Sequence, residues 1–448
     1  MTAQRCFHIV TLGCKVNQYE SQALREAWLA LGGMETPKPR EAAVILVNSC
    51  AVTARAVADL RAVVRRLRRA APLARIIVTG CAARLLEEKQ DAVPDADLLV
   101  LHAHKANLAK ISPEQLGRKD RPASNRNPAL FPPLNISGYN RSRAVLKIQD
   151  GCSHCCTYCF VPLARGPARS RPFAESLAEA RRLLDAGFRE IVVSGINLRQ
   201  YREPEGGDFW DFLTRLDAAL APQWAGQARL RISSLEPGQL GQKALDCLAS
   251  CRLAAPHLHI SLQSGSASVL ARMGREHYDP ADLVPFLQAL RGIWPRFGLG
   301  ADILCGFPGE SETEARESLG LIRQLPLGYA HVFPYSRRPG TRAAALPDQL
   351  PAELKKLRAA AVRALLEEKQ QTFLHSLLDC ASLHVVFDQG KRTGVSEHYA
   401  DCRLLAEAAL PPADKAGFLL RVRPLAVSGN YLVVQPLEGL PEGLEDAR

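Results

Sequence analysis

Short apolar runs alternate with helical stretches along the first hundred residues of the chain. Four runs have the length and composition of buried strands, and three stretches between them carry apolar residues at helical spacing. The strand-like runs are residues 7–12, 44–47, 76–78 and 98–101, and the helical stretches are residues 21–31, 57–70 and 84–89. Because strands and helices alternate, this segment is predicted to form a parallel sheet flanked by helices.

A second series of strand-like runs lies between residues 143 and 335. Its members are also separated by helical stretches, and they are residues 143–148, 191–194, 229–233, 257–263, 299–305 and 331–335. Six such units over roughly 190 residues are too few to close the eight-stranded barrel of the TIM fold. The pattern therefore predicts an open, partial TIM-type barrel.

The C-terminal part changes to a pattern of short strands. A helical stretch at residues 354–373 precedes strand-like runs at 383–387, 393–397, 417–423 and 431–435, with Gly and Pro turns between them. This arrangement predicts a small β-barrel. Residues 111–142 are rich in Pro, Asn and Arg and have weak periodicity. The chain is thus expected to be an α/β protein with an N-terminal sheet domain (1–110), a basic linker (111–140), an open-barrel domain (141–375) and a small β-barrel (376–440).

Composition and charge narrow the class of protein. The 448 residues carry a formal net charge of +11, which permits a polyanionic partner such as nucleic acid. No run approaches the ~18 apolar residues of a membrane span, and polar residues interrupt the N-terminus before a signal-peptide core can form. We therefore expect a cytoplasmic protein without membrane contact. Thirteen cysteines in such a chain indicate metal or redox chemistry more than disulfides.

Five arginines lie on the helical stretch that ends at residue 70, opposite its apolar face. They are Arg61, Arg65, Arg66, Arg68 and Arg69. A solvated helix face is slightly favoured over contact with RNA.

Four cysteines fall within residues 152–159, directly after the first barrel strand. Neighbouring cysteines form strained disulfides, so a metal explains them better. Cys152, Cys156 and Cys159 could hold a 4Fe–4S cube and leave one iron free for a cofactor. Alternatively, the pairs Cys152/Cys155 and Cys156/Cys159 could hold tetrahedral zinc. The loop alone favours neither arrangement strongly.

Three further cysteines each follow one of the first three strands, and we call Cys14, Cys50 and Cys81 the strand-end cysteines. In a parallel sheet the carboxyl ends of the strands share one edge, so these thiols are expected to converge. Free cysteine is often simply buried, which is the alternative explanation. Since all three occupy the same position relative to a strand, a second metal centre is preferred.

Polar residues and glycines also gather after the barrel strands. Glycine lets a ligand approach the backbone, and Ser, Asn, Gln and Glu can bind ribose hydroxyls or an amino-acid head group. The expected cofactor-binding residues are Ser194, Gly195, Asn197, Ser234, Glu236, Gln263 and Gly306. Their position on one rim beside a metal loop favours an adenosine-type cofactor over ordinary turns. Arg165, Arg169 and Arg171 suggest contacts with phosphate or carboxylate groups, with a solvated basic turn as the alternative.

These motifs together carry a resemblance to a known family. A strand followed by Cys-x3-Cys-x-aromatic-Cys on an open barrel resembles the radical S-adenosylmethionine superfamily, and the strand-end cysteines make the chain similar to the methylthiotransferases. The segments that resemble the branch acting on N6-threonylcarbamoyladenosine in tRNA are residues 11–17, 48–53, 233–237, 259–265 and 331–336. The isopentenyladenosine branch usually has Gln-Met in place of Lys15-Val16, and a noncysteine residue is usual at Cys155. Residues 394–399 are similar to the TRAM module, a small RNA-binding barrel.

The resemblance implies an enzyme with two 4Fe–4S clusters. Cys152, Cys156 and Cys159 would hold the cluster that binds S-adenosylmethionine and yields a 5′-deoxyadenosyl radical, and the strand-end cysteines would hold an auxiliary cluster that carries the sulfur. The implied target is C2 of the modified adenine beside the anticodon of tRNA, in the anticodon stem-loop, with the three arginines as tRNA contacts. An electron donor and a sulfur source are further expected partners. A zinc-stabilised RNA-binding protein and a related enzyme that modifies a protein side chain are the two alternatives.

Overall fold

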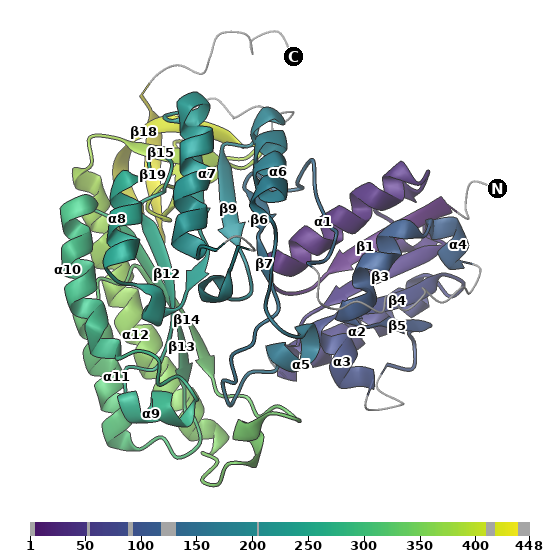
Figure 1. Ribbon diagram of the computed structural model, residues 1–448, viewed down its shortest axis with the longest axis horizontal. Coiled ribbons are helices and arrows are strands. Elements are labelled where there is room, and N and C mark those ends of the chain that lie inside the picture. The colour runs from purple at the N-terminus through teal and green to yellow at the C-terminus, as the bar shows by residue number, and fades with distance from the viewer. Residues whose placement is uncertain are drawn as a thin grey trace.

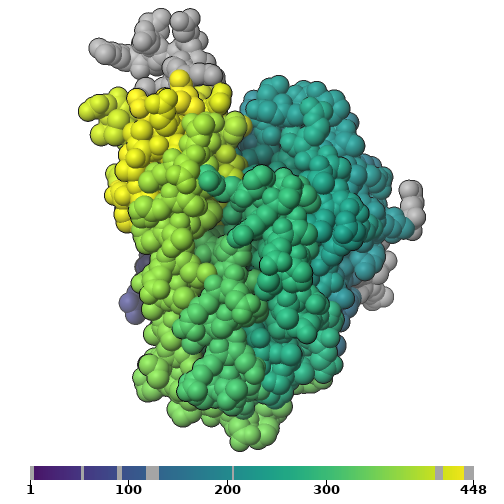
Figure 2. Space-filling view, turned by 90° about the vertical axis from the view of Figure 1, so that its left-hand side faces the viewer, coloured from purple at the N-terminus to yellow at the C-terminus, as the bar shows by residue number. Residues whose placement is uncertain are grey.

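The computed structural model describes residues 5–51, 54–87, 93–117, 131–203, 206–408 and 417–437. An N-terminal sheet domain lies beside a larger central barrel, and a small C-terminal barrel lies against one end of the central one (Figure 1). In the view of Figure 2, the central helices cover the face turned away from the N-terminal sheet, which is almost hidden behind them. The predicted α/β fold class is confirmed in all three parts.

The N-terminal sheet has five parallel strands in the order β2-β1-β3-β4-β5. The four predicted strands are present, and the two-residue β2 was missed because both of its residues are exposed. The strands are β1 (Cys6–Thr11), β2 (Met34–Glu35), β3 (Val44–Ser49), β4 (Arg75–Gly80) and β5 (Leu98–Val100), and the helices are α1 (Lys15–Ala30), α2 (Ala54–Ala70), α3 (Cys81–Glu87) and α4 (Pro113–Gly117).

Helix α1 begins at Lys15, directly after Cys14 and well before the predicted start at residue 21. Its first turns carry polar residues that break the apolar pattern, yet Asn17 and Glu20 are fully buried. Polar groups are buried when other polar groups satisfy them, and such partners lie far away in the sequence. The helical pattern therefore underestimated the length of α1.

The central barrel consists of two parallel sheets, β10-β9-β6 and β11-β12-β13-β14, joined by an isolated bridge between Leu230 and Ala254. All six predicted strands are present and the barrel is open, as predicted. The strands are β6 (Ala144–Lys147), β9 (Glu190–Ser194), β10 (Arg229–Ile232), β11 (Ser234–Leu235), β12 (His257–Gln263), β13 (Gly298–Cys305) and β14 (Tyr329–Pro334). The short pair β7 (Gln149–Asp150) and β8 (Arg169–Ser170) flanks the cysteine loop.

Helices cover the outside of this barrel (Figure 1). They are α6 (Phe173–Asp185), α7 (Phe209–Trp224), α8 (Gln242–Ser250), α9 (Ala267–Arg272), α10 (Leu283–Ile293), α11 (Glu312–Gln324) and α12 (Ala352–Ser376), whereas α5 (Val161–Arg165) packs against α3 of the N-terminal sheet domain. Alternation along β12 shows how the two faces differ, because Leu258 and Ile260 join the main hydrophobic core while His257 and His259 contact the hydroxyl of Tyr329. The inner face of the barrel is therefore polar.

The C-terminal strands form a closed barrel in the order β15-β16-β17-β19-β18. They are β15 (Leu383–Phe387), β16 (Thr393–Ser396), β17 (Asp401–Leu404), β18 (Phe418–Ser428) and β19 (Tyr431–Pro436), of which only β17 was not predicted. Arg229 and Arg231 of β10 donate to four backbone carbonyls of this barrel, those of His384, Val395, Ser396 and Glu397. These bonds attach the small barrel to the central one.

The expected basic linker is only partly described, since residues 118–130 lie outside the described ranges. On the N-terminal side of this gap, residues 113–117 form α4. On the far side, Leu134 and Ile136 are buried, and the carboxylate of Glu26 accepts bonds from the backbone of Ser137 and Gly138. The described parts of this segment are therefore packed structure, which corrects the expectation of a linker there.

Candidate active site

The cysteine loop lies at the carboxyl ends of the barrel strands, between β7 and α5. Asn197 donates to the sulfur of Cys152 over 3.7 Å, and Arg275 donates to the sulfur of Cys156 over the same distance. Burial raises the pKa of both thiols, and it raises the pKa of Cys159 to about 12. We call Cys152, Cys156 and Cys159 the loop cysteines.

Cys155 differs from the loop cysteines. Its side chain is exposed, its sulfur is 4.0 Å from the carbonyl of Ser153, and its own carbonyl accepts a bond of 2.6 Å from Arg342. Tetrahedral zinc would need this fourth thiol to turn inward. In the described ranges, no three cysteine sulfurs lie within 4.8 Å of one another, the close grouping that suits one ion. The donor set fits a larger cluster held by three thiolates, which must first lose their protons.

The strand-end cysteines occupy the equivalent edge of the N-terminal sheet. Cys14 is exposed, Cys50 is buried, and Cys81 is the buried first residue of α3. Asn17 donates to the carbonyl of Leu12 and to that of Ser49, each over 2.9 Å, and so joins the ends of β1 and β3.

Two glycines permit the close approach of these strand ends. Gly13 has a φ of 99°, and a Cβ placed there would lie 2.5 Å from Cβ of Cys50. Gly80 has a φ of 95°, and its Cβ would collide with the backbone of Ser49. Both positions need a left-handed backbone and have no room for a side chain. The prediction that these strand ends converge therefore agrees with the backbone, and the donor set can hold a second cluster.

Arg165 links the two cysteine groups. It ends α5, which follows the loop, and its Nε donates to the sulfur of Cys81 over 3.3 Å. The rest of its guanidinium donates over 2.8 Å to Asn17, Glu20 and Asp150. Since Asp150 precedes the loop and Asn17 follows Cys14, one buried side chain ties the loop segment to the strand-end segment.

Glu20 and Asp150 are fully buried carboxylates surrounded by cations. Burial alone would raise the pKa of Glu20, but Arg165, Lys105 and Lys147 outweigh burial and hold this pKa well below its usual range. The pKa of Asp150 is depressed in the same way by Lys147, His102 and Arg165. The shared lysine, Lys147, lies 2.8 Å from each carboxylate. Both carboxylates are therefore ionised, and the cations among them leave no place for a metal.

The three arginines that were expected to contact tRNA have buried side chains. Arg165 and Arg171 are each only 3% exposed, and Arg171 is paired with the buried carboxylate of Glu179 over 2.8 Å. The side chain of Arg169 is 9% exposed and lies 3.7 Å from Asp150. The sequence showed the charges, but it could not show the carboxylates that they meet within the fold.

The predicted cofactor-binding residues surround the loop on the barrel rim. Ser194 and Asn197 are buried after β9, and the backbone amide of Asn197 donates to Gln149. Gln263 has a φ of 62°, which marks a strained turn at the end of β12. The remaining expected residues are Gly195, which packs against Gln149, Gly306, which packs against Lys355, and Ser234, which is exposed.

Glu236 has the partners that sequence reasoning missed. Its carboxylate is paired with Arg275 and lies 3.5 Å from His277, and Arg275 also reaches Cys156. Within the described chain, the buried Oγ of Ser233 and Nε of Arg275 have no hydrogen-bond partner. Buried polar atoms left unsatisfied beside a metal loop are suited to a polar ligand, so the rim fits a cofactor with hydroxyl or carboxylate groups. Arg275 stands alone in its segment, and no spacing pattern indicated it.

Comparison with known proteins identifies the family. Residues 6–101 match the uncharacterized protein family UPF0004, and residues 146–322 match the Radical SAM superfamily. The threonylcarbamoyladenosine tRNA methylthiotransferase MtaB of Rickettsia prowazekii is 34% identical over 364 residues, which cover 79% of this chain and 81% of the relative. The chain belongs to the radical SAM methylthiotransferase family. This methylthiotransferase is also 35% identical to MtaB of Bacillus subtilis, and the aligned residues cover 81% of this chain and 80% of the relative.

Other relatives of this methylthiotransferase carry a different name. The tRNA-2-methylthio-N6-dimethylallyladenosine synthase of Sphingopyxis alaskensis is 31% identical over 97% of the chain and 98% of the relative. Among solved structures, the radical S-adenosylmethionine methyltransferase TsrM of Kitasatospora setae, with cobalamin and a 4Fe–4S cluster bound, has a TM-score of 0.54 at 14% identity and covers 76% of this chain and 77% of that one. This likeness concerns the fold of the methylthiotransferase alone.

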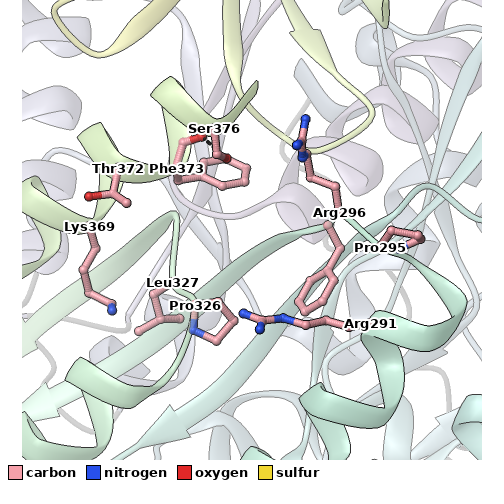
Figure 3. A pocket seen from close by; sticks show the side chains of 10 residues that line it. Arg291, Pro295, Arg296, Pro326, Leu327, Lys369, Thr372, Phe373 and Ser376 are labelled. Atoms are coloured by element: carbon pink, nitrogen blue, oxygen red, sulfur yellow. Dashed lines mark hydrogen bonds between the residues drawn. The ribbon is translucent and has the colours of Figure 1, made fainter. Parts of the chain in front are cut away.

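A separate cavity of about 420 Å³ lies at the other end of the barrel (Figure 3). Its lining includes Phe297 and Leu327, which precede β13 and β14, and Lys369 and Phe373 of α12. In parallel barrels the chemistry is located at the carboxyl ends of the strands, so this cavity of the methylthiotransferase is not the candidate active site. In the part of the chain that the structure describes, no helix is long and apolar enough to cross a membrane.

Proposed function

We propose that this enzyme transfers a methylthio group to C2 of N6-threonylcarbamoyladenosine next to the anticodon of cytoplasmic tRNA. It would use two 4Fe–4S clusters and S-adenosylmethionine, together with an electron donor and a sulfur source. The names of several relatives support the substrate, since those from Rickettsia prowazekii, Bacillus subtilis and Aquifex aeolicus, at 31–35% identity, are called threonylcarbamoyladenosine tRNA methylthiotransferases. A target beside the anticodon lies in a single-stranded loop, where a base can turn out of the stack.

The single observation that carries this proposal is the buried connection between the two cysteine groups. Arg165 follows the loop cysteines in the chain and donates to the sulfur of Cys81, while Asp150, its partner, precedes Cys152. Two metal centres held this close can act on one substrate. A protein that used one cluster alone would have no need for a buried charged contact to the second group.

The roles of the chain's own residues follow from their contacts. The loop cysteines would hold one cluster and the strand-end cysteines the other. Bound together, the first cluster and S-adenosylmethionine supply one-electron chemistry that the protein itself lacks. Asn197 and Arg275 donate to loop sulfurs, which stabilises their thiolate form. Ser194, Glu236 and Gln263 line the rim on which the cofactor would lie.

The C-terminal barrel, proposed here as residues 376–440, is a further candidate to contact the tRNA, from the end of the central barrel opposite this rim. Arg229 and Arg231 fix it to the central barrel through backbone bonds, so its orientation is set by the fold. Small barrels of this kind commonly bind single-stranded RNA. The α/β sheet domain (1–110) and the open barrel (141–375) complete the proposed division of the chain.

A second candidate substrate is a tRNA with dimethylallyladenosine at the same position. The observation that favours it is the similarity to the Sphingopyxis alaskensis synthase over nearly the whole chain. The two substrates differ in the group on N6, which is anionic in one and apolar in the other.

One experiment separates these functions. Anaerobically reconstituted enzyme, S-adenosylmethionine and a reductant would be incubated with tRNA that carries either modified adenosine, and the nucleosides would be analysed by mass spectrometry. We expect a methylthio product from the threonylcarbamoyl tRNA. A product from the dimethylallyl tRNA alone would replace the substrate assignment, and no methylthio nucleoside from either would refute the proposed function.

A further inference from the structure

A cavity of about 540 Å³ lies where the three parts of the molecule meet. Its lining comes from the start of α1, from the segment that leads into β6, and from the turn after β15. Lys15 of α1 directly follows Cys14, so this cavity begins beside a strand-end cysteine. Val145 of β6 and Val192 of β9 also line it.

The walls of this cavity are positively charged. Four cationic side chains line it, Lys15, Arg141, Arg143 and Lys391, against the single carboxylate of Asp388. That carboxylate already accepts bonds from Ser142 over 2.9 Å and from Thr393 over 3.3 Å. The surplus of positive charge therefore favours an anionic ligand.

Lys15 and Arg143 converge on one aromatic ring. The ammonium of Lys15 lies 5.9 Å from the ring centre of Tyr399, and the guanidinium of Arg143 lies 5.4 Å from it. Arg143 lies 3.7 Å from the carboxylate of Glu190, which also holds Arg229 and Arg231 at 2.6 Å. Burial alone would lower the pKa of Arg143. The negative charges of Glu190 and Asp388 and a hydrogen bond to Tyr399 stabilise its charge and raise this pKa instead. In the described ranges, no carboxylate is within 4 Å of the Lys15 ammonium. Lys15 is therefore the less compensated of the two cations.

Tyr399 shows how positive this place is. Burial would raise the pKa of its phenol, yet Lys15 and Arg143 reverse the shift and lower this pKa. The residue also has a φ of 66°, a conformation that few side chains adopt, so the backbone fixes the ring under both cations.

We propose that Lys15 and Arg143 bind a carboxylate on the N6 substituent of the substrate adenosine, and so select an anionic over an apolar substituent. This inference rests on the proposed function, because it concerns the same substrate. The threonyl part of threonylcarbamoyladenosine ends in a carboxylate, which forms strong charge-assisted bonds with two cations. A dimethylallyl group has no polar atom and would offer neither cation a partner.

The place of the cavity favours this carboxylate over a backbone phosphate of the same RNA. Apolar and aromatic side chains, those of Val145, Val192 and Tyr139, stand beside the cations in its walls, and Lys15 directly follows Cys14. The base that reacts must come close to that cysteine.

The test measures binding of anticodon stem-loop RNAs that carry threonylcarbamoyladenosine, dimethylallyladenosine or plain adenosine at the target position. Wild-type enzyme is expected to prefer the first RNA, and Lys15→Gln should reduce that preference about tenfold, while affinity for plain adenosine changes little. Lys15→Arg keeps the charge and should retain most of the preference. Lys356→Gln, a surface change on α12, is the matched control.

The outcomes distinguish the substrate carboxylate from a backbone phosphate, and they distinguish failure of this inference from failure of the proposed function. An equal loss of affinity for all three RNAs in Lys15→Gln would mean that Lys15 contacts phosphate. An unchanged preference would mean that Lys15 contacts neither anion. Each result overturns the inference, while a methylthio product from wild-type enzyme still supports the proposed function. If wild-type enzyme binds no RNA, the proposed function and the inference both fail. Because Lys15 is exposed, an unchanged melting temperature should accompany each variant.

Discussion

The loop cysteines and the strand-end cysteines differ in how the chain brings them together. The loop cysteines belong to one segment of eight residues, so local sequence determines which thiols can act jointly. The strand-end cysteines are separated by more than thirty residues each, and only the parallel order of β1, β3 and β4 unites them. The first group can be recognised from spacing, whereas the second becomes a group only after the sheet is predicted.

The two groups also differ in exposure. The loop cysteines are buried or half-buried and have donors at their sulfurs, while Cys14 of the strand-end group is exposed beside the cationic cavity. A cluster at the strand ends would be accessible to a large substrate from the side of Cys14, because Cys50 and Cys81 are buried. This difference suits a division into radical formation at the loop and sulfur transfer at the strand ends.

Removing one cysteine from each group should have the largest effect and tests whether the two groups have different roles. Cys159→Ala should abolish S-adenosylmethionine cleavage and methylthio transfer together, because an open iron that binds the cofactor would be lost. Cys14→Ala should abolish methylthio transfer but keep cofactor cleavage. The measurement is 5′-deoxyadenosine and methylthio nucleoside from the same reaction. Equal loss of cleavage in both variants would contradict the division of roles.

Removing the link between the groups should have the next largest effect. Arg165→Met would leave Glu20 and Asp150 with fewer cations in a buried site, and we expect a loss of about 3–5 kcal/mol in the free energy of unfolding. Denaturant unfolding of the cluster-free protein measures it. Arg65→Met on the exposed face of α2 is the control and should change stability by less than about 0.5 kcal/mol. Similar losses in the two variants would remove the argument for a buried connection.

A pH dependence should arise at the same connection. Burial lowers the pKa of His102 to about 4, although Asp150 at 2.9 Å opposes this shift. The unfolded chain has a His pKa of about 6.5, so between these values only the unfolded state binds the proton. Stability contributed by neutral His102 is therefore complete above about pH 6.5 and is lost as the pH falls toward 4.

The loss between pH 7 and pH 5 should be about 2 kcal/mol, and His102→Gln should make stability less dependent on pH in this interval. The free energy of unfolding of both proteins at the two pH values checks this. A variant as pH-dependent as the wild type would show that His102 is not the responsible group.

The smallest expected effect concerns the backbone of the strand-end group. Gly13→Ala places a Cβ against Cys50 at a positive φ and should destabilise the protein by about 1–3 kcal/mol, with a lower iron content after reconstitution. Gly226, which also has a positive φ but open space around it, provides the matched control. If both Ala variants retain full iron, close packing at Gly13 is not needed for the metal site.

The sequence allowed much of this architecture to be predicted, because apolar runs and their order are local properties. The four main N-terminal strands and the six barrel strands are present. The strand β2 was missed because both of its residues are exposed, and β17 because the charged Asp401 and Arg403 interrupt its apolar residues. Long-range ion pairs could not be predicted in the same way. The sequence does not show that Arg165, Arg171 and Glu20 are buried, because their partners lie 8 to 152 residues away and charge alone does not reveal burial.

A chain that holds two clusters should contain twice the iron and sulfide of a chain that holds one. The content of both elements per chain is therefore the deciding measurement. We would reconstitute wild-type enzyme, Cys50→Ala and Cys156→Ala under anaerobic conditions and measure both elements together with the iron–sulfur absorption. The account expects about eight irons in the wild type and about four in each variant. About four irons in the wild type, with no change in Cys50→Ala, would contradict it.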